Sequence, residues 1–244
     1  NDDSNLNNNN KLGLSIEDIK EKFIPNAVNA IKHQHPDVVN FAFRLIVLLS
    51  EFLPIQALNT FFDKIYYNVD PECEIRNQIL SVLREVLSNS VNYSEDRQKK
   101  IVKFFVKKLN KNANLEILIF NIDLLTSLTE NLGFLYTKED LEEVKKLICE
   151  YSEDNRLDVL PSIASLAKYW MVVALPEQFD EMMSFLYELS EKNVNAFTIL
   201  SSMVCYKPTI YQKECTRLIQ LFLDRIIQEQ DNMNQEMETD LFSD

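Results

Sequence analysis

The sequence predicts an all-α protein built from stacked helical hairpins. The 244 residues include only two glycines, Gly13 and Gly133, whereas average usage of about 7% would give roughly 17. Glycine serves tight β-turns, bulges and phosphate loops, so its scarcity argues against all three. Apolar residues recur at helical spacing along most of the chain, and no segment alternates with the two-residue period of a strand.

The first two helices are predicted on either side of the dipeptide His35-Pro36. Ser15 begins the first helix with a capping box in which Asp18 replaces the usual glutamate. His35 ends that helix, because a residue that precedes proline avoids the α region. Pro36 starts the second helix, and residues 38–49 are so nearly all apolar that this helix must lie between neighbours.

Nine further helices follow at similar lengths. Pro54, Pro71, Pro176 and Pro208 fall where four of them begin, as suits the first turn of a helix. Gly133 suits the left-handed position that ends a helix, and Pro161 predicts a bend within another. The predicted ranges are 54–67, 70–87, 94–109, 113–132, 137–151, 155–175, 176–192, 194–206 and 208–228.

Two terminal segments differ from the helical array over residues 15–229. Residues 1–14 are rich in asparagine and are predicted to be flexible. Residues 230–244 form a polar, acidic tail, in which Met233, Met237 and Leu241 lie at helical spacing. Two interpretations of this tail are open: a short helix that docks in a groove, and a solvated segment.

The predicted helices pair into hairpins that recur at a regular interval. First helices begin near residues 16, 55, 95, 138, 177 and 209, and second helices begin near 37, 72, 113, 155 and 194. Most of these intervals are 35–43 residues. Such a period is typical of helical hairpins stacked in a row rather than of a compact bundle.

Two of the hairpins resemble the repeats of HEAT-repeat proteins. In residues 23–45, Pro25 lies in the first helix, the turn is His35-Pro36-Asp37, and the second helix carries a small residue and leucine. The segment Asp70-Pro71-Glu72-Cys73-Glu74-Ile75-Arg76 resembles the family's Asp-Pro turn with an arginine in the following helix. The third pair, with its turn at Asn110–Asn114, keeps only the outline, and later pairs match in spacing alone.

This resemblance implies a right-handed α-solenoid of about five hairpins plus a C-terminal helix. It also implies that the second helices line an inner face that binds partner proteins. The short third helix and hinge glycine of the armadillo variant are missing. The polar positions expected on the inner face are Asn40, Arg44, Arg76, Asn77, Ser81, Arg84, Asn121, Ser162, Ser165 and Tyr169.

Arg76 has two open interpretations. An arginine in the first turn of a helix can reach a carboxylate or carbonyl groups of the adjacent turn. Arg76 is then one rung of a polar ladder between repeats. The alternative is a direct contact with a partner.

A basic stripe stands out in this acidic chain. Lys99, Lys103 and Lys107 lie on one face of the predicted helix 94–109. One interpretation is a docking surface for an acidic peptide or a nucleic-acid backbone, and the other is an outer, solvated face. The full basic stripe is Arg97, Lys99, Lys100, Lys103, Lys107, Lys108 and Lys111.

Trp170 is the sole tryptophan, and it is interpreted either as a core residue or as an aromatic contact on the inner face. Karyopherin-type proteins place an asparagine one turn after such a tryptophan, and Ala174 stands there in this chain. The cysteines are scattered without ligand spacing and are predicted to be small buried residues of an intracellular protein. They are Cys73, Cys149, Cys205 and Cys215.

The sequence offers little for catalysis or metal binding. His33 and His35 are the only histidines, and Asp37 is the only further ligand near them. No Gly-x-Ser-x-Gly segment, Walker loop or dinucleotide-binding loop is present in the sequence. We therefore expect a protein with no enzymatic activity, no metal and no cofactor.

The net negative charge of the chain indicates which class of partner to expect. The net charge is −13 and the pI is about 4.7, so general binding to nucleic acid is disfavoured. We expect a non-catalytic scaffold or adaptor that binds proteins with basic segments, in the cytoplasm or the nucleus, without a membrane or a small-molecule substrate. The alternative is a nucleic-acid-associated solenoid subunit, in chromosome organisation or RNA processing, that uses the basic stripe 97–111.

Overall fold

The computed structural model describes residues 15–66, 76–107, 114–153, 156–206 and 212–241. Every regular element within these ranges is a helix, which confirms the all-α prediction. The elements are α1 (Ile16–Asp18), η1 (Ile19–Phe23, a π-helix), α2 (Ile24–Ala30), α3 (Pro36–Phe52), α4 (Leu58–Tyr66), α5 (Arg76–Ser90), α6 (Glu95–Val106), α7 (Leu115–Leu132), η2 (Gly133–Leu135, a 3₁₀-helix), α8 (Lys138–Glu153), α9 (Leu160–Val173), α10 (Pro176–Ser190), α11 (Val194–Tyr206) and α12 (Gln212–Leu241).

Capping residues start several helices where the sequence predicts them. The Asp18 N–H donates to Ser15 Oγ at 3.0 Å, and the Ser15 hydroxyl donates to the Asp18 carboxylate at 2.6 Å. Thr137 and Asp140 pair in the same way at the start of α8. Asn114 caps α7 by accepting the Ile117 N–H at 3.0 Å. These side chains satisfy amide groups that have no partner inside the helix.

Two predicted details at the centre of the chain are wrong. Gly133 follows the last residue of α7 as expected, but its φ of −59° and ψ of −25° are right-handed. It is buried, so this turn uses the missing side chain of glycine rather than a positive φ. Pro161 does not bend a helix, because α9 begins at Leu160 and holds Pro161 in its first turn.

Other helices also differ from their predicted ranges, and α4 begins at Leu58 rather than at Pro54. In the first hairpin, α2 begins at Ile24 directly after the π-helix η1 and holds Pro25 in its first turn. Proline lacks an N–H and its ring crowds the preceding turn, and a local π-turn accommodates both effects. The last helix was expected to end near residue 228, but α12 continues to Leu241. The segment 1–14, Asp70-Pro71 and Pro208 lie outside the described residues.

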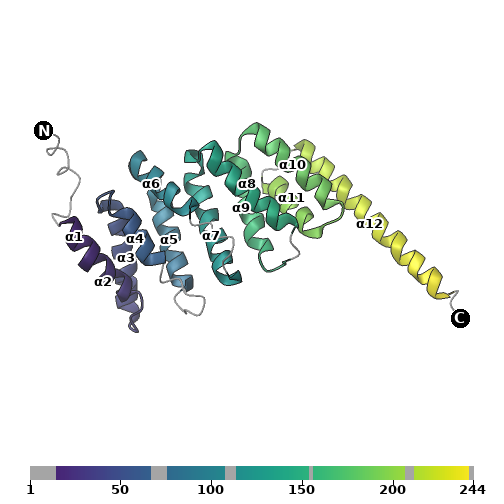
Figure 1. Cartoon of the computed structure of the whole chain (residues 1–244). Coiled ribbons are helices and arrows are strands. Elements are labelled where there is room, and N and C mark those ends of the chain that lie inside the picture. The colour runs from purple at the N-terminus through teal and green to yellow at the C-terminus, as the bar shows by residue number, and fades with distance from the viewer. Residues whose placement is uncertain (1–14, 67–75, 108–113, 154–155, 207–211, 242–244) are drawn as a thin grey trace. The chain divides into compact units, whose positions relative to one another are not determined.

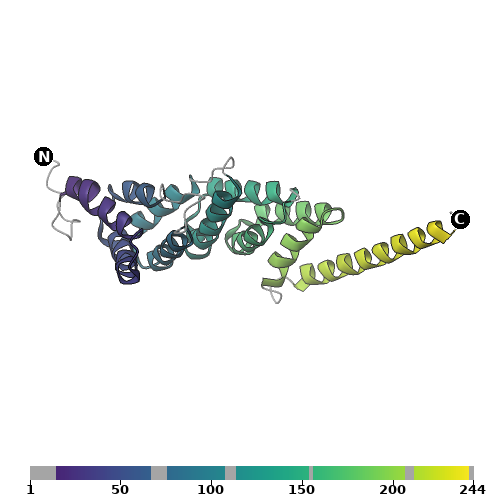
Figure 2. The same cartoon turned by 90° about the horizontal axis from the view of Figure 1, so that it is seen from below.

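The chain forms two compact units, Asn1–Asp140 and Leu141–Asp244. In the first unit, α2 contacts α4 and α4 contacts α6, while α3 contacts α5 and α5 contacts α7. First helices therefore pack on first helices and second helices on second helices, as can be followed for this unit in Figures 1 and 2. Phe62 of α4 fills the space toward α6, with its ring centroid 5.5 Å from that of Phe104 and 5.1 Å from that of Phe105.

In the second unit, α11 packs against α9, α10 and α12. Trp170 of α9 is fully buried, and its indole N–H donates to the Leu141 carbonyl of α8 at 3.0 Å. The core interpretation of this tryptophan is therefore correct. Lys145 of α8 bridges Glu142 at 3.0 Å and Glu181 of α10 at 2.6 Å, which links the two first helices.

Buried serines recur near the C-terminal ends of four helices. They are Ser50 of α3, Ser90 of α5, Ser152 of α8 and Ser190 of α10, and each is fully buried. Each hydroxyl donates to a carbonyl three or four residues earlier in its own helix. Each serine carbonyl accepts a hydrogen bond from a later side chain, in turn Arg97, Gln98, Asn193 and Arg225.

These contacts solve one packing problem in the same way each time. The last carbonyls of a helix have no partner within it, and burying them without a donor is unfavourable. For Ser50, Ser152 and Ser190, the donor lies 35–47 residues downstream, close to the predicted repeat interval. A small, internally bonded serine thus lets a later segment close the end of an earlier helix. Among the described residues, no helix is both long and apolar enough to span a bilayer.

Candidate interaction surfaces

The second helices carry the candidate partner contacts, on α3, α5, α7 and α9. Five of them are exposed: Asn40, Arg44, Asn77, Ser81 and Arg84. Arg76, Ser162, Ser165 and Tyr169 are half-buried, and Asn121 is buried. The exposed set lies on α3 and α5, which are neighbours in the first unit.

Two ion pairs connect α5 to α7. Arg76 pairs with Glu116, which lies 40 residues later in the first turn of α7. Arg84 pairs with Asp123 at 3.4 Å. Both arginines thus contact a neighbouring second helix, and only 23% of the Arg76 side chain is exposed. The ladder interpretation of Arg76 requires such a contact between neighbouring repeats. The exposed parts of both ion pairs lie on the face formed by the second helices α5 and α7.

Asn121 lies in the core of the first unit rather than on its surface. Its side chain is 6% exposed, and its Oδ1 accepts the hydroxyl of Tyr66 at 2.5 Å. Its buried Nδ2 has no hydrogen-bond partner within the described residues. The sequence placed Asn121 on the partner-binding face because it is polar, and nothing in the local pattern indicates the tyrosine that buries it.

Tyr169 belongs to an aromatic cluster between α9 and α11. Its ring packs edge-on against Tyr206, with centroids 5.7 Å apart. Lys168 Nζ lies 4.5 Å from the Tyr169 centroid and 5.1 Å from the Tyr206 centroid. The sequence pattern did not single out Lys168, which directly precedes Tyr169 in α9, or Tyr206, which is the last residue of α11. The three side chains form a cation–π arrangement on the second unit.

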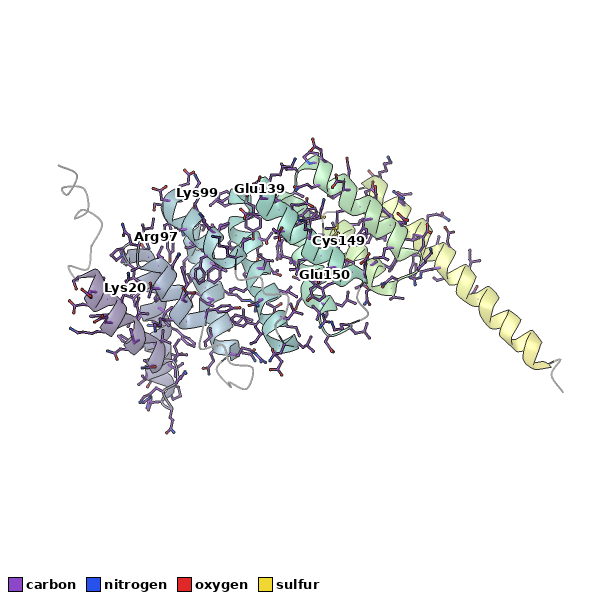
Figure 3. All side chains as sticks on the ribbon, viewed as in Figure 1. Lys20, Arg97, Lys99, Glu139, Cys149 and Glu150 are labelled. Carbon is purple, nitrogen blue, oxygen red and sulfur yellow. The ribbon has the colours of Figure 1, made fainter. Side chains whose placement is uncertain are left out.

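Arg97 does not belong to the exposed basic stripe. Its guanidinium donates to the Ser50 carbonyl at 2.8 Å and to the Leu53 carbonyl, so it closes the C-terminal end of α3. Burial lowers the pKa of this guanidinium, and Tyr93 and Glu51 partly offset that effect. Arg97 and Lys99, both labelled in Figure 3, therefore have different roles on the same helix.

Lys99, Lys103 and Lys107 form what we call the lysine ridge, on the exposed side of α6. All three are exposed, and Lys99 pairs with Glu95 at 2.5 Å. Like charges four residues apart on a helix repel one another, by about 0.2–0.5 kcal/mol per pair. Lys108 and Lys111, also in the predicted stripe, lie outside the described residues.

Two grooves flank the lysine ridge, and all three ridge lysines line both. The first, which we call the α4 groove, has a volume of about 520 Å³ and reaches Asn59 and Asp63 of α4; its further lining residues are Asp96, Lys100 and Phe104. The second, the η2 groove, has a volume of about 390 Å³. It is floored by Val102 and Val106 of α6 and closed by Leu135, Thr137 and Asp140.

A third surface is the apolar face of α12. Its exposed residues follow helical spacing, and each has 37–61% of its surface exposed; they are Ile219, Phe222, Leu223, Ile226 and Ile227. On its packed side, α12 is held by the Tyr187 hydroxyl, which donates to the Glu214 carbonyl at 3.0 Å, and by the bond from Arg225 to Ser190. An exposed apolar face of this kind is typical of a protein contact. Its periodicity is readable in the sequence, but sequence alone does not tell a buried stripe from an exposed one.

The histidines serve the turn between α2 and α3. His33 Nδ1 accepts the His35 N–H at 3.0 Å, and His35 Nδ1 accepts the Asp37 N–H at 3.3 Å. The part of the chain that the structure describes contains no group of three or more histidine, cysteine or acidic side chains that could hold a metal ion.

The cysteines are less uniform than the sequence suggests. Burial raises the pKa of Cys149 to about 11, so this thiol stays protonated at neutral pH. Cys205 is exposed, so the prediction that it is buried is wrong. It lies near the end of α11, where one side of the helix faces solvent. Cys73 lies outside the described residues.

Comparison with known proteins adds no assignment. No protein-family model matches the sequence, and a search of curated proteins finds no match. The HEAT-like resemblance therefore stands on the residues and spacing described above.

Proposed function

We propose that this protein is a non-catalytic, HEAT-like scaffold that binds partner proteins along the face of its second helices. In this proposal the hairpins form a right-handed α-solenoid of about five units plus the last helix. The partner carries a basic segment, and the surface formed by α3, α5 and α7 receives it.

One observation carries the proposal: first helices contact first helices, and second helices contact second helices, within the first unit. The two helices of a hairpin also contact one another, as α2 does with α3 and α6 with α7, and the rows of like helices are what a stack of hairpins adds to those contacts. The serine contacts add support, because the same arrangement recurs in both units, at the ends of α3, α5, α8 and α10. Repeats that contact only their neighbours are what makes an extended binding face available.

The charge of the surface supports a basic partner. Glu116, Asp123 and Glu130 lie seven residues apart along one side of α7, and Glu85 is exposed on α5. Arg76 and Arg84 pair with Glu116 and Asp123, and the net charge of the whole protein is −13. Such a field attracts cationic segments and weakens as salt is added.

The test is direct binding of a fluorescein-labelled lysine- and arginine-rich peptide, measured by anisotropy. The double variant Asn77→Arg/Ser81→Arg places bulk and positive charge on the exposed face of α5, and it should weaken binding about tenfold or more. The matched control is Gln56→Arg/Ser184→Arg, which adds the same charge at exposed positions outside the second helices. Equal weakening by both variants would contradict the proposal, and so would binding that neither variant changes.

A further inference from the structure

We propose that the lysine ridge and the η2 groove bind an acidic peptide segment that also carries apolar side chains. This surface lies on a first helix, so it is separate from the proposed face of the second helices and does not rest on it. The partner class follows from three features of the site: its charge, its apolar floor and its flanking carboxylates.

The charge of the ridge is the first step. Lys99, Lys103 and Lys107 line both grooves, and they project from one side of α6 in a protein that is otherwise strongly acidic. Neither Lys103 nor Lys107 forms an ion pair with the described residues, and the Glu95 partner of Lys99 is itself exposed. Lysines at this spacing repel one another, and an anionic ligand that lies along them removes that repulsion.

The floor of the η2 groove is the second step. Val102 and Val106 are 3% and 9% exposed, so only a small part of each lines the base of the groove, and the half-buried Leu135 adds to this apolar lining. Leu135 closes the far side. At about 390 Å³ the groove has room for one or two apolar side chains, as expected of a site that anchors a peptide.

The flanking carboxylates distinguish a peptide from a nucleic acid. Asp140 lines the η2 groove, and Asp63 and Asp96 line the α4 groove. A phosphate backbone carries charge at every nucleotide, so it would meet these carboxylates on both sides of the ridge. A peptide helix can present acids to the lysines and turn apolar or neutral side chains toward the carboxylates. Arg97, which would extend a phosphate-binding stripe, is already bound to the end of α3.

The experiment uses the full chain and four labelled probes. The first is an amphipathic peptide of about 16 residues with glutamates on one helical face and leucines on the other. The second replaces its leucines by serines, the third replaces its glutamates by glutamines, and the fourth is a single-stranded oligonucleotide of equal charge. Affinities are measured by fluorescence anisotropy at low and high salt.

The glutamate–leucine peptide should bind more tightly than the serine peptide and the glutamine peptide, and its binding should weaken as salt is added. The triple variant Lys99→Glu/Lys103→Glu/Lys107→Glu should lose about tenfold or more in affinity for that peptide. The neutral triple variant to glutamine should lose less, and it serves as the test if the glutamate variant is poorly folded by circular dichroism.

The matched control is Lys32→Glu/Lys192→Glu/Lys213→Glu, which changes the net charge equally at three exposed lysines away from the ridge. An equal loss in this control would overturn the proposal, because long-range charge would then explain the binding. Oligonucleotide binding that is tighter than peptide binding and sensitive to the ridge would overturn it in favour of a nucleic-acid surface. Equal binding of the serine peptide would overturn the role of the apolar floor. None of these outcomes bears on the second-helix face, which the Asn77/Ser81 variant tests separately.

Discussion

A single hydrogen bond illustrates how the interior of the first unit is constrained. Tyr66 is the donor that satisfies the buried Oδ1 of Asn121, while the Nδ2 of that side chain is already without a partner among the described residues. An unsatisfied buried polar atom costs about 1–3 kcal/mol, which is more than the net gain from a typical hydrogen bond. Removing the Tyr66 hydroxyl would therefore be unfavourable mainly because it leaves the buried Oδ1 of Asn121 without a donor.

We predict that Tyr66→Phe lowers the free energy of unfolding by about 1–2 kcal/mol. Asn121→Leu should be close to neutral, because the half-buried Tyr66 hydroxyl retains access to water. The double variant should regain most of what Tyr66→Phe loses, since no buried acceptor remains. Urea denaturation of the parent protein, the two single variants and the double variant gives the coupling energy between Tyr66 and Asn121. Additive effects of the two substitutions would contradict this account.

At the scale of helices, substitutions of a buried serine test whether it lets a later side chain cap the end of its helix. Ser190→Ala removes a local bond to the Tyr187 carbonyl and should cost about 1 kcal/mol. Ser190→Leu should cost roughly 2–4 kcal/mol, because it overpacks the site and displaces Arg225 from the carbonyl. The control Ser184→Leu, on the exposed side of the same helix, should stay within about 0.5 kcal/mol. Similar losses at positions 184 and 190 in chemical denaturation would be evidence against the capping role.

The link between α8 and α10 predicts a pH dependence. Burial raises the pKa of Glu142, but hydrogen bonds from Lys145 and Gln178 outweigh that effect and hold the pKa below its usual value of 4.5. The native state therefore binds this proton less readily than the unfolded state does. The stabilisation is complete above the unfolded pKa and disappears as the pH falls through the lower native value.

Glu142→Gln should therefore reduce stability near pH 7 and flatten its decline between about pH 5 and pH 3. The control is Glu153→Gln, an exposed glutamate near the end of the same helix. Urea midpoints measured across this pH range provide the comparison. A decline as steep in Glu142→Gln as in the parent protein would show that other carboxylates dominate acid unfolding.

Local patterns predicted the elements well, and long-range contacts account for what they missed. The Ser15 and Thr137 caps, and the range of α11, follow from residues within a few positions of one another. The role of Arg97 and the burial of Asn121 depend on partners 47 and 55 residues away. Judged by side-chain type alone, Arg97 and Asn121 are both expected on the surface, because a polar residue in a periodic pattern is normally exposed.

At the scale of the whole molecule, the solenoid proposal makes a prediction about dimensions. A compact globular protein of this length has a radius of gyration of about 18 Å. A row of about five hairpins should exceed that value clearly in small-angle X-ray scattering. A measured radius near 18 Å would contradict the solenoid, even though every helix described above would remain in place.

The serine contacts also bear on how the chain is made. Each of three helix ends is closed by a donor 35–47 residues later, so the acceptor leaves the ribosome well before the group that binds it. At a synthesis rate of about 5–20 residues per second, the delay is roughly 2–9 s. Translation speed thereby sets how long the carbonyls at each of these helix ends remain without the side chain that caps them in the folded protein.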